Sequence, residues 1–190
     1  MLSLLVEHHD GGGLNTAELL STVTLLLGAG FLTTTNLIGN GLLALLQHPG
    51  EMDRLWADPT LVGSAVEEML RYDTPVQLIS RQVLTDVEVE GVQFREGEGV
   101  VALLGAANRD PAWIPEPDRF DIGRPDHGHL SFAWGSHYCL GARLARLEAQ
   151  LVFAGLRQRF ARLDLAGEPR QRPGLALRAL ESLPVRLTPR

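Results

Sequence analysis

The sequence predicts a mainly α fold with small β-sheets (α+β), in a single domain over residues 1–190. No charged side chain occurs from Leu19 to Leu46, a run that suits a long helix and far exceeds an ordinary strand. Leucine and alanine recur at helical spacing from Leu140 to Ala154, just after the single cysteine. We therefore expect a long central helix and a cysteine loop that precedes a second helix. No internal repeat or linker divides the chain.

The N-terminal part is predicted to be helical. Residues 8–13 are polar and rich in glycine, which indicates a loop. Asn15 or Thr16 is a candidate N-cap with Glu18 in the first turn, so the long helix should begin there. It should end at about Gln47, because a proline disfavours helix in the residue ahead of it. Two further helices are expected, over residues 50–57 and 60–72.

Beyond Pro75 the pattern changes to short strands and loops. Residues 87–94 predict a hairpin around Glu90-Gly91, and residues 100–104 predict a buried strand. The connection over residues 112–129 is long, and such loops are usually functional or wrapped around something. The second helix should run to about Phe160, and a terminal hairpin is expected from Leu175 onward.

Composition and charge limit the classes of partner. The chain is 45% hydrophobic and 21% charged, as in ordinary soluble domains. All 17 basic residues are arginine and the net charge is -6, so we expect neither nucleic acid nor an anionic membrane as a partner. One cysteine cannot form an internal disulfide, and the N-terminus lacks the pattern of a secretory signal. A cytoplasmic location fits these features.

The uncharged run leaves two interpretations open. It is longer than the roughly 20 residues that a helix needs to span a bilayer. Threonine and asparagine side chains lie along it, which would be costly facing lipid, and no basic residue flanks it before Arg54. A helix buried all round in a protein core is therefore favoured over a membrane span.

The string FAWGSHYCLG, residues 132–141, sets the lone cysteine between two glycines ahead of a helix. A helix N-terminus offers free N–H groups and positive potential, which stabilise a thiolate, and a thiolate can bind a metal. Gly135 and Gly141 would let the backbone pass close to a flat cofactor. Without this context, a single cysteine is usually a small buried hydrophobic residue.

This string resembles the haem-ligand segment of the cytochrome P450 family, whose pattern is filled by Phe132, Gly135, His137, Cys139 and Gly141. The resemblance implies that Cys139 is the axial thiolate ligand of haem b, and that His137 contacts a haem propionate. Such a ligand pushes electron density onto the iron and favours O–O cleavage. Ala133 departs from the pattern, because glycine is common at that position.

Other motifs match the same family in the correct order. Glu68-Met69-Leu70-Arg71 resembles its Glu-x-x-Arg motif, and Pro117-Asp118-Arg119-Phe120 resembles its Pro-x-Arg-Phe motif. The resemblance implies that Glu68, Arg71 and Arg119 form a buried structural network, whereas helical spacing alone would indicate an ordinary surface pair. Arg81 stands where the family often holds a haem propionate, and residues 108–111 match a recurrent turn.

The segment 29–34 resembles the oxygen-binding segment of the family. There, Ala29 and Gly30 would leave room for dioxygen, and the Thr33 hydroxyl would organise water and pass protons. Leu32 stands where the family has an acid, so proton delivery should be slow or rerouted. Taken alone, the segment would indicate only small residues that permit close helix packing.

Arg143, Arg146, Gln150 and Arg157 are expected on the face of the second helix opposite the leucine stripe. A charged outer face of this kind is either solvated or a docking patch. In the resembled family the corresponding surface receives an acidic electron donor such as a ferredoxin.

The resemblance implies a cytochrome P450-like fold that is incomplete, because family members are about twice this long and the chain matches their C-terminal half. We expect a haem-thiolate monooxygenase or its C-terminal portion. Its expected partners are a ferredoxin-type electron donor, an apolar small-molecule substrate and the missing N-terminal half. The alternative is a haem-free remnant or interaction module. Three explanations of the short length are expected to fit: a truncated product, one part of a split protein, or a mis-started gene model.

Overall fold

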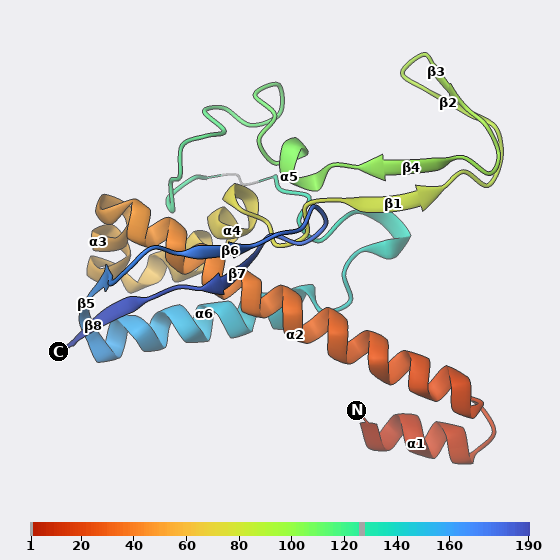
Figure 1. Cartoon of the computed structure of the whole chain (residues 1–190), viewed down its shortest axis with the longest axis horizontal. Coiled ribbons are helices and arrows are strands. Elements are labelled where there is room, and N and C mark those ends of the chain that lie inside the picture. Colours follow the sequence, from red (N-terminus) through yellow and green to blue (C-terminus); the bar gives the residue numbers. More distant parts are fainter. Residues whose placement is uncertain (1, 126–127) are drawn as a thin grey trace.

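The computed structural model describes residues 2–125 and 128–190 and is mainly helical with small sheets, as predicted (Figure 1). Its longest element is α2 (Thr16–Gln47), which runs through the molecule as an axis. Three helices gather around the C-terminal half of α2, whereas α1 (Leu2–Asp10) lies at the opposite end. These three are α3 (Pro49–Ala57), α4 (Val62–Tyr72) and α6 (Ala142–Arg159).

The start of α2 is fixed by a capping box. The Asn15 side chain accepts a hydrogen bond from the Glu18 N–H (3.0 Å), and the Glu18 carboxylate accepts one from the Asn15 N–H (2.8 Å). The prediction of the cap and of the helix end at Gln47 is confirmed. The predicted loop over residues 8–13 is shorter, because α1 continues to Asp10 and the chain turns only at the following glycines.

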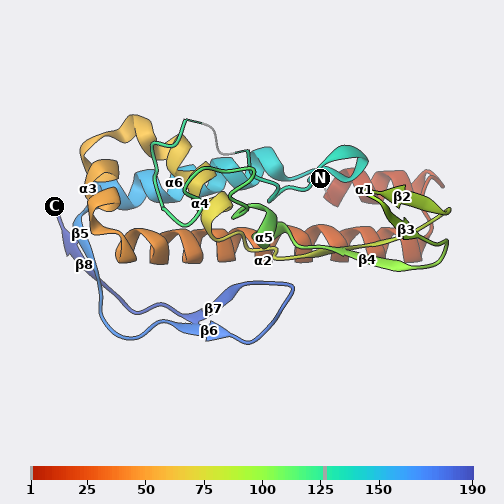
Figure 2. The same ribbon diagram turned by 90° about the horizontal axis from the view of Figure 1, so that it is seen from above.

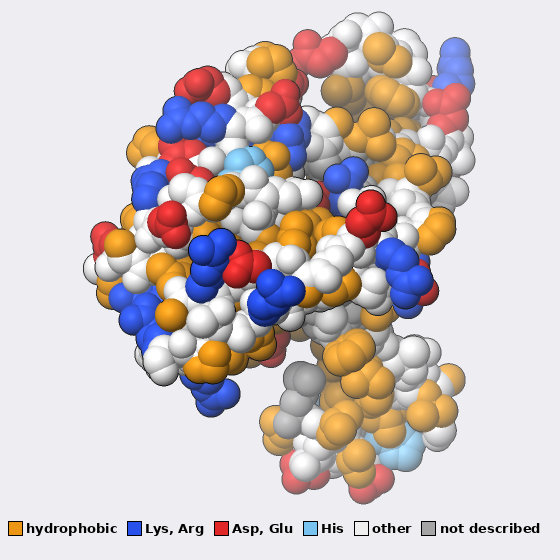
Figure 3. All heavy atoms as spheres, turned by 60° about the vertical axis from the view of Figure 1, so that its left-hand side comes forward, with side chains coloured by type: hydrophobic (Ala, Val, Ile, Leu, Met, Phe, Trp, Pro, Cys, Tyr) orange, Lys and Arg blue, Asp and Glu red, His pale blue; other side chains and the backbone are white. Residues whose placement is uncertain are grey.

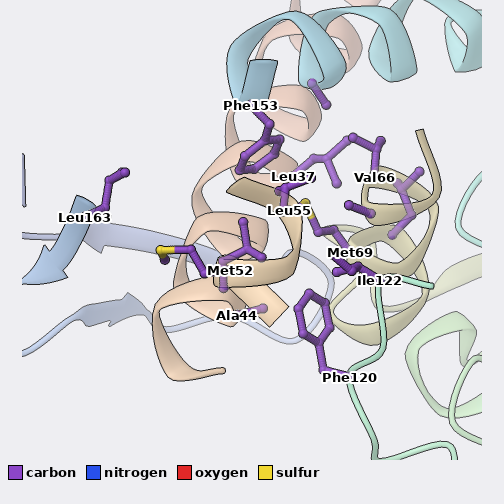
Figure 4. Close-up of a cluster of buried hydrophobic side chains, with 14 of the residues drawn as sticks. Leu37, Ala44, Met52, Leu55, Val66, Met69, Phe120, Ile122, Phe153 and Leu163 are labelled. Atoms are coloured by element: carbon purple, nitrogen blue, oxygen red, sulfur yellow. The ribbon is translucent and has the colours of Figure 1, made fainter. Parts of the chain in front are cut away.

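The core lies between the C-terminal half of α2 and helices α3, α4 and α6 (Figure 4). Leu45, Leu55, Val66 and Phe153 are fully buried there, and Leu37 is 2% exposed. α4 approaches α2 closely at a glycine: a Cβ at Gly41 would lie 2.5 Å from Met69 Sδ. The two helices can therefore pack at this distance only because residue 41 has no side chain.

The N-terminal half of α2 is exposed, so the expectation of a helix buried all round was wrong. Burial begins at Thr34, and the large side chains before it face outward. They are Leu20 (61% exposed), Leu25 (68%), Leu27 (72%) and Phe31 (68%). Figure 3 shows apolar side chains gathered over the protruding end that α1 forms with the start of α2. Apart from α1, no element of the described chain packs against this first half of the apolar run, whereas the second half lies in the core.

By length and by a mean hydropathy of 1.4, α2 passes the test for a membrane span, and its most apolar stretch is 0% buried. Helices from the cores of soluble proteins pass the same test, so this is weak support for a span. Residues of α2 from Thr34 to Leu45 also pack into the protein core. Only the exposed first half would then be left to face lipid, which is shorter than the roughly 20 residues required.

Four two-stranded antiparallel sheets complete the described part of the fold. β1 (Ile79–Gln82) pairs with β4 (Gly99–Ala102), and β2 (Val87–Val89) forms the predicted hairpin with β3 (Val92–Phe94). Glu90 and Gly91 both have positive φ (51° and 79°), as a two-residue hairpin turn requires. β4 was expected to be buried, but three of its four residues are exposed because, among the described strands, it pairs only with β1.

The C-terminal strands do not form the single terminal hairpin that was predicted. β7 (Ala179–Ser182) pairs with β6 (Arg170–Arg172), and β8 (Val185–Pro189) returns to pair with β5 (Phe160–Leu165) directly after α6. Figure 2 shows α6 on one side of α2 and the β6–β7 pair on the other. The return of the chain terminus to α6 could not be read from the local pattern of residues 175–190.

Candidate functional site

The cysteine loop lies immediately ahead of α6 and is held by its own backbone. The Cys139 N–H donates to the Phe132 carbonyl (3.0 Å), which closes the loop, and the Tyr138 N–H donates to the Gly135 carbonyl (3.0 Å) across the short helix η2 (Gly135–His137). Gly135 has a φ of 75°, and open space surrounds the position of a Cβ there. Glycine is therefore favoured at this turn because of the positive φ, and not because another group approaches closely.

Cys139 is exposed, three residues before the first residue of α6. Its carbonyl accepts a hydrogen bond from the Ala142 N–H (3.2 Å), which ties it to the first turn of that helix. The prediction of a buried hydrophobic cysteine is thus excluded.

The donor set around Cys139 fits a haem better than a bare metal ion. Among residues 2–125 and 128–190, no three or more His, Cys, Asp or Glu side chains come together as a metal site would need. A metal held at Cys139 would therefore take at most two such ligands from this part of the chain. That suits an iron whose equatorial ligands belong to a macrocycle, since structural and catalytic ion sites use three or four protein ligands.

The large apolar side chains of the cysteine loop differ in burial. Phe132 is 9% exposed and belongs to the core cluster, which anchors the beginning of the loop. Trp134 (83% exposed) and Leu140 (90% exposed) stand out from it on either side of Cys139. The described chain therefore presents an apolar surface around the sulfur, of the kind that a flat apolar cofactor could cover.

The predicted Glu68–Arg71 pair is fully buried, with both side chains 0% exposed. Arg71 Nε and Nη2 donate to the two Glu68 oxygens (2.7 and 2.8 Å) in a bidentate ion pair. The remaining N–H groups donate to the carbonyls of Asn108 (3.1 Å), Pro117 (2.7 Å) and Arg119 (3.0 Å). All five N–H groups of the guanidinium are thus satisfied, and α4 is bound to the long connection that follows α5 (Leu104–Ala107).

The second arginine side chain of this network is that of Arg124, whereas the sequence predicted Arg119. Arg124 is 10% exposed, and its Nε lies 3.3 Å from Glu68 Oε2. The Arg119 side chain is 57% exposed and pairs with the carboxylates of Glu116 (3.2 Å) and Asp121 (3.1 Å). Arg119 enters the network through its backbone carbonyl, which accepts from Arg71 and from Arg124.

Asn108 connects this network to the segment that precedes the cysteine loop. Its side chain is 1% exposed, donates to Ser131 Oγ (2.9 Å) and accepts from the Leu130 N–H (2.7 Å). Ser131 Oγ in turn donates to the Leu70 carbonyl of α4 (2.7 Å). Hydrogen bonds of Leu130 and Ser131 therefore tie the segment that leads into Phe132 to Asn108 and to α4.

The predicted oxygen-side residues lie where α2 leaves the core. Ala29, Gly30 and Leu32 are exposed, Thr33 is half-buried, and open space surrounds the position of a Cβ at Gly30. The Thr33 hydroxyl donates to the Ala29 carbonyl (2.6 Å) within the helix. The hydroxyl retains its acceptor capacity, and the Leu32 side chain beside it offers no proton donor.

The two predicted propionate contacts are on separate elements. Arg81 lies on β1, is exposed and donates to the Ser80 carbonyl (2.8 Å). It lines an apolar hollow of about 480 Å³ at the base of the hairpin, together with Val83, Leu84, Val87 and Val100. His137 is exposed at the end of η2.

The orientation predicted for α6 was wrong for Arg146 and Arg157, which turn inward, whereas Arg143 is exposed as expected; the leucines of the stripe turn outward. Leu144 (59% exposed), Leu147 (52%) and Leu151 (64%) form an exposed leucine face with Leu140. Arg146 binds Glu67 on α4, and Arg157 Nε donates to the Trp56 carbonyl (3.0 Å). The helix buries small and aromatic residues instead, namely Ala142, Ala149 and Phe153.

Sequence reasoning missed Asn108, Arg124, Glu67 and Arg146 as residues that support the loop. Asn108 was noticed only as part of a turn, and its buried amide could have been suspected because turn asparagines often bind backbone groups. For Arg124 the long, arginine-bearing connection after residue 112 was the available signal. For Glu67 and Arg146 no local signal exists, because they are 79 residues apart in sequence.

Comparison with known proteins agrees with this arrangement. The family model described as "Cytochrome P450" matches residues 57–178. The "Biotin biosynthesis cytochrome P450" of Bacillus subtilis (strain 168) is 50% identical over 186 residues, which is 97% of this chain and 47% of that protein. The chain spans about half the length of the curated relatives it matches.

Solved structures give the same result. P450BioI, in complex with an acyl carrier protein that carries hexadec-9Z-enoic acid, superposes with a TM-score of 0.91 at 46% identity, over 98% of this chain and 52% of that one. The tirandamycin C-bound P450 monooxygenase TamI superposes with a TM-score of 0.94 at 38% identity, over 98% and 48% of the respective chains.

Proposed function

This chain belongs to the cytochrome P450 family, and on that premise we propose that it is the C-terminal portion of a haem-thiolate monooxygenase. Members of this family hold a haem through a cysteine thiolate. The proposed reaction inserts one oxygen atom from dioxygen into an organic substrate, with electrons from a redox partner. The single observation that carries the proposal is the exposed lone thiol of Cys139, held at the N-terminus of α6 in a site that has no other clustered metal donors among the described residues.

Cys139 is proposed as the iron ligand of haem b, and His137 and Arg81 as the groups that bind its propionates. When bound, the haem supplies the site of oxygen activation, and a thiolate ligand favours O–O cleavage. The chain contributes the orientation of the sulfur, through the hydrogen bond from the Cys139 N–H to the Phe132 carbonyl. Phe132, Gly135 and Gly141 shape the loop around it.

On the oxygen side, Ala29 and Gly30 are proposed to leave room for dioxygen because they carry no bulky side chain, and Thr33 is the proposed proton-passing group. Leu32 cannot donate a proton, so water or a substrate hydroxyl would have to deliver protons to Thr33. The buried Glu68, Arg71 and Arg124, together with the Arg119 carbonyl, have a structural role in this proposal, since they hold the segment that leads into the loop.

The proposed partners are a ferredoxin-type electron donor, an apolar small-molecule substrate and a polypeptide that corresponds to the other half of the relatives. The last of these is supported by the exposed leucine face of α6 and the exposed half of α2, which the described chain leaves uncovered. A cytoplasmic location, without membrane or nucleic acid as partner, remains part of the proposal. The alternative is a haem-free interaction module, which Leu32 favours.

The test is the carbon monoxide difference spectrum of the reduced, haem-reconstituted chain, compared with that of Cys139→Ala. A red-shifted Soret band that the substitution abolishes would support Cys139 as the ligand. If the chain takes up no haem, the measurement is repeated with the N-terminal half of a close relative supplied as a separate polypeptide. The absence of the red-shifted band in that complex would overturn the proposal in favour of the haem-free module.

A further inference from the structure

Glu67 and Arg146 form a second polar cluster beside the cysteine loop, separate from the buried Glu68–Arg71 network. Glu67 precedes Glu68 on α4, and neighbouring residues on a helix point about 100° apart. The Glu67 carboxylate therefore faces α6 while Glu68 faces the core network. Arg146 Nε and Nη2 donate to its two oxygens (2.7 and 2.9 Å) in a bidentate pair.

His129 completes the anchor on the α4 side. Its Nε2 lies 3.0 Å from Glu67 Oε2, and its ring is 4% exposed. The Ser131 N–H donates to Nδ1 of the same ring (3.2 Å), so Nδ1 is the acceptor and the hydrogen belongs on Nε2. The Glu67 carboxylate is thus fixed from two directions, by α6 and by the segment that leads into the cysteine loop.

Arg146 also touches both sides of the loop itself. Its Cζ lies 4.4 Å from the centroid of the Phe132 ring, and its Nη1 donates to the Tyr138 hydroxyl (3.2 Å). Phe132 supplies the carbonyl that accepts from the Cys139 N–H, and Tyr138 is the residue before Cys139. One guanidinium therefore connects the two ends of the loop to a fixed carboxylate on α4.

We propose that Arg146, anchored by Glu67, is a positioning residue that sets the place of the Cys139 sulfur. The inference rests on the proposed role of Cys139 as a haem ligand. It requires an arginine, because the side chain uses the planar fork on Glu67, a further N–H on Tyr138 and its face on Phe132 at the same time. A lysine ammonium offers a single point charge and can satisfy only part of this set.

The test compares Arg146→Gln and Arg146→Lys with Arg143→Gln, a matched control that removes the same charge from an exposed position of α6. Hydrogen exchange of the haem-free, full 190-residue chain is followed in the peptide that covers residues 132–139. Both Arg146 variants should raise the exchange rate there about tenfold, the factor expected for one lost charge-assisted hydrogen bond, and Arg143→Gln should leave it unchanged.

The second measurement is the carbon monoxide spectrum of the haem-loaded proteins, with the complementary half supplied to all of them if wild type requires it. The fraction with the red-shifted Soret band should fall in both Arg146 variants and not in Arg143→Gln. If the haem-loaded wild-type protein lacks this band, the proposed role of Cys139 as ligand is refuted. The hydrogen-exchange rates still test the positioning role of Arg146 in that case.

Three outcomes would overturn the positioning role. The first is an exchange rate over residues 132–139 in Arg146→Gln equal to that of Arg143→Gln. The second is an equal rise over α2 and α4, because Arg146 would then serve general stability only. The third is full restoration by lysine, which would mean that charge alone suffices.

Discussion

Replacing Arg71 by lysine tests whether the buried arginine of α4 binds the long connection to the core. Lysine keeps the positive charge opposite Glu68 but has three donors in place of five. Two or more of the five hydrogen bonds that Arg71 makes would therefore be lost. The carbonyls of Asn108 and Pro117 are the acceptors at risk, because the Arg119 carbonyl also accepts from Arg124. An unsatisfied buried acceptor costs about 1–3 kcal/mol, so the expected loss of unfolding free energy is about 2–5 kcal/mol.

This loss is large compared with the roughly 5–15 kcal/mol that stabilises a folded domain. For a chain of this size it should lower Tm by about 5–20 °C. Urea unfolding followed by tryptophan fluorescence and by circular dichroism measures the change as a shift of the midpoint at constant slope.

Arg95→Lys is the control, because Arg95 (76% exposed) pairs with Asp86 at 3.4 Å on the surface, where a pair is worth only about 0–1 kcal/mol. If the midpoint of Arg71→Lys stayed within error of this control, the five hydrogen bonds would not be the link between α4 and the connection, and the reasoning above would be refuted.

Three further predictions concern the surroundings of this network. Burial raises the pKa of Glu67, but hydrogen bonds from His129 and Arg146 outweigh this and lower it to about 2; its stabilising effect is therefore complete above its ordinary pKa of 4.5 and is lost as the pH falls toward 2. Glu67→Gln should accordingly flatten acid unfolding followed by circular dichroism in that range, and an unchanged acid profile would contradict this. Asn108→Ala should lower the unfolding free energy by about 1–3 kcal/mol in urea, because the Leu130 N–H and the Ser131 hydroxyl lose a buried partner, and a smaller change would indicate that water replaces the amide. The double variant Leu144→Ser, Leu151→Ser should reduce self-association of the chain in sedimentation velocity, because it makes the exposed leucine face polar. Undiminished association would mean that the chains associate through another surface.

Local signals predicted the elements of the fold well where each was complete within a few residues. The capping box at Asn15 and the turn at Glu90-Gly91 are such cases, because the side chains that define them interact within four positions. The cysteine loop was also predictable, since its closing bond, from Cys139 to Phe132, lies within one motif.

The errors arose where a pattern allowed two tertiary solutions. Helical periodicity in α6 showed a leucine face and an arginine face but could not say which one points inward. Arg146 and Arg157 have stems long enough to reach an acceptor on another helix, and those acceptors are remote in sequence. The exchange of Arg119 for Arg124 has the same origin, because two arginines five residues apart on one irregular segment compete for one buried carboxylate.

The distribution of polar and apolar contacts also bears on how the site becomes complete. An ion pair and hydrogen bonds, most of them part-buried, hold the side of the cysteine loop that faces α4, through Asn108, Glu67 and Arg146. Large apolar side chains are left exposed on Leu140, on the leucine face of α6 and on the first half of α2. A thiolate ligand needs its own orientation and also a low-dielectric surrounding that excludes water. The described chain provides the first of these by itself, whereas the second requires that the exposed apolar faces be covered. On the roles proposed for Cys139 and Arg146, orientation of the sulfur and retention of a haem are expected to be separable, the former depending on Arg146 and the latter on the proposed polypeptide that covers the leucine face.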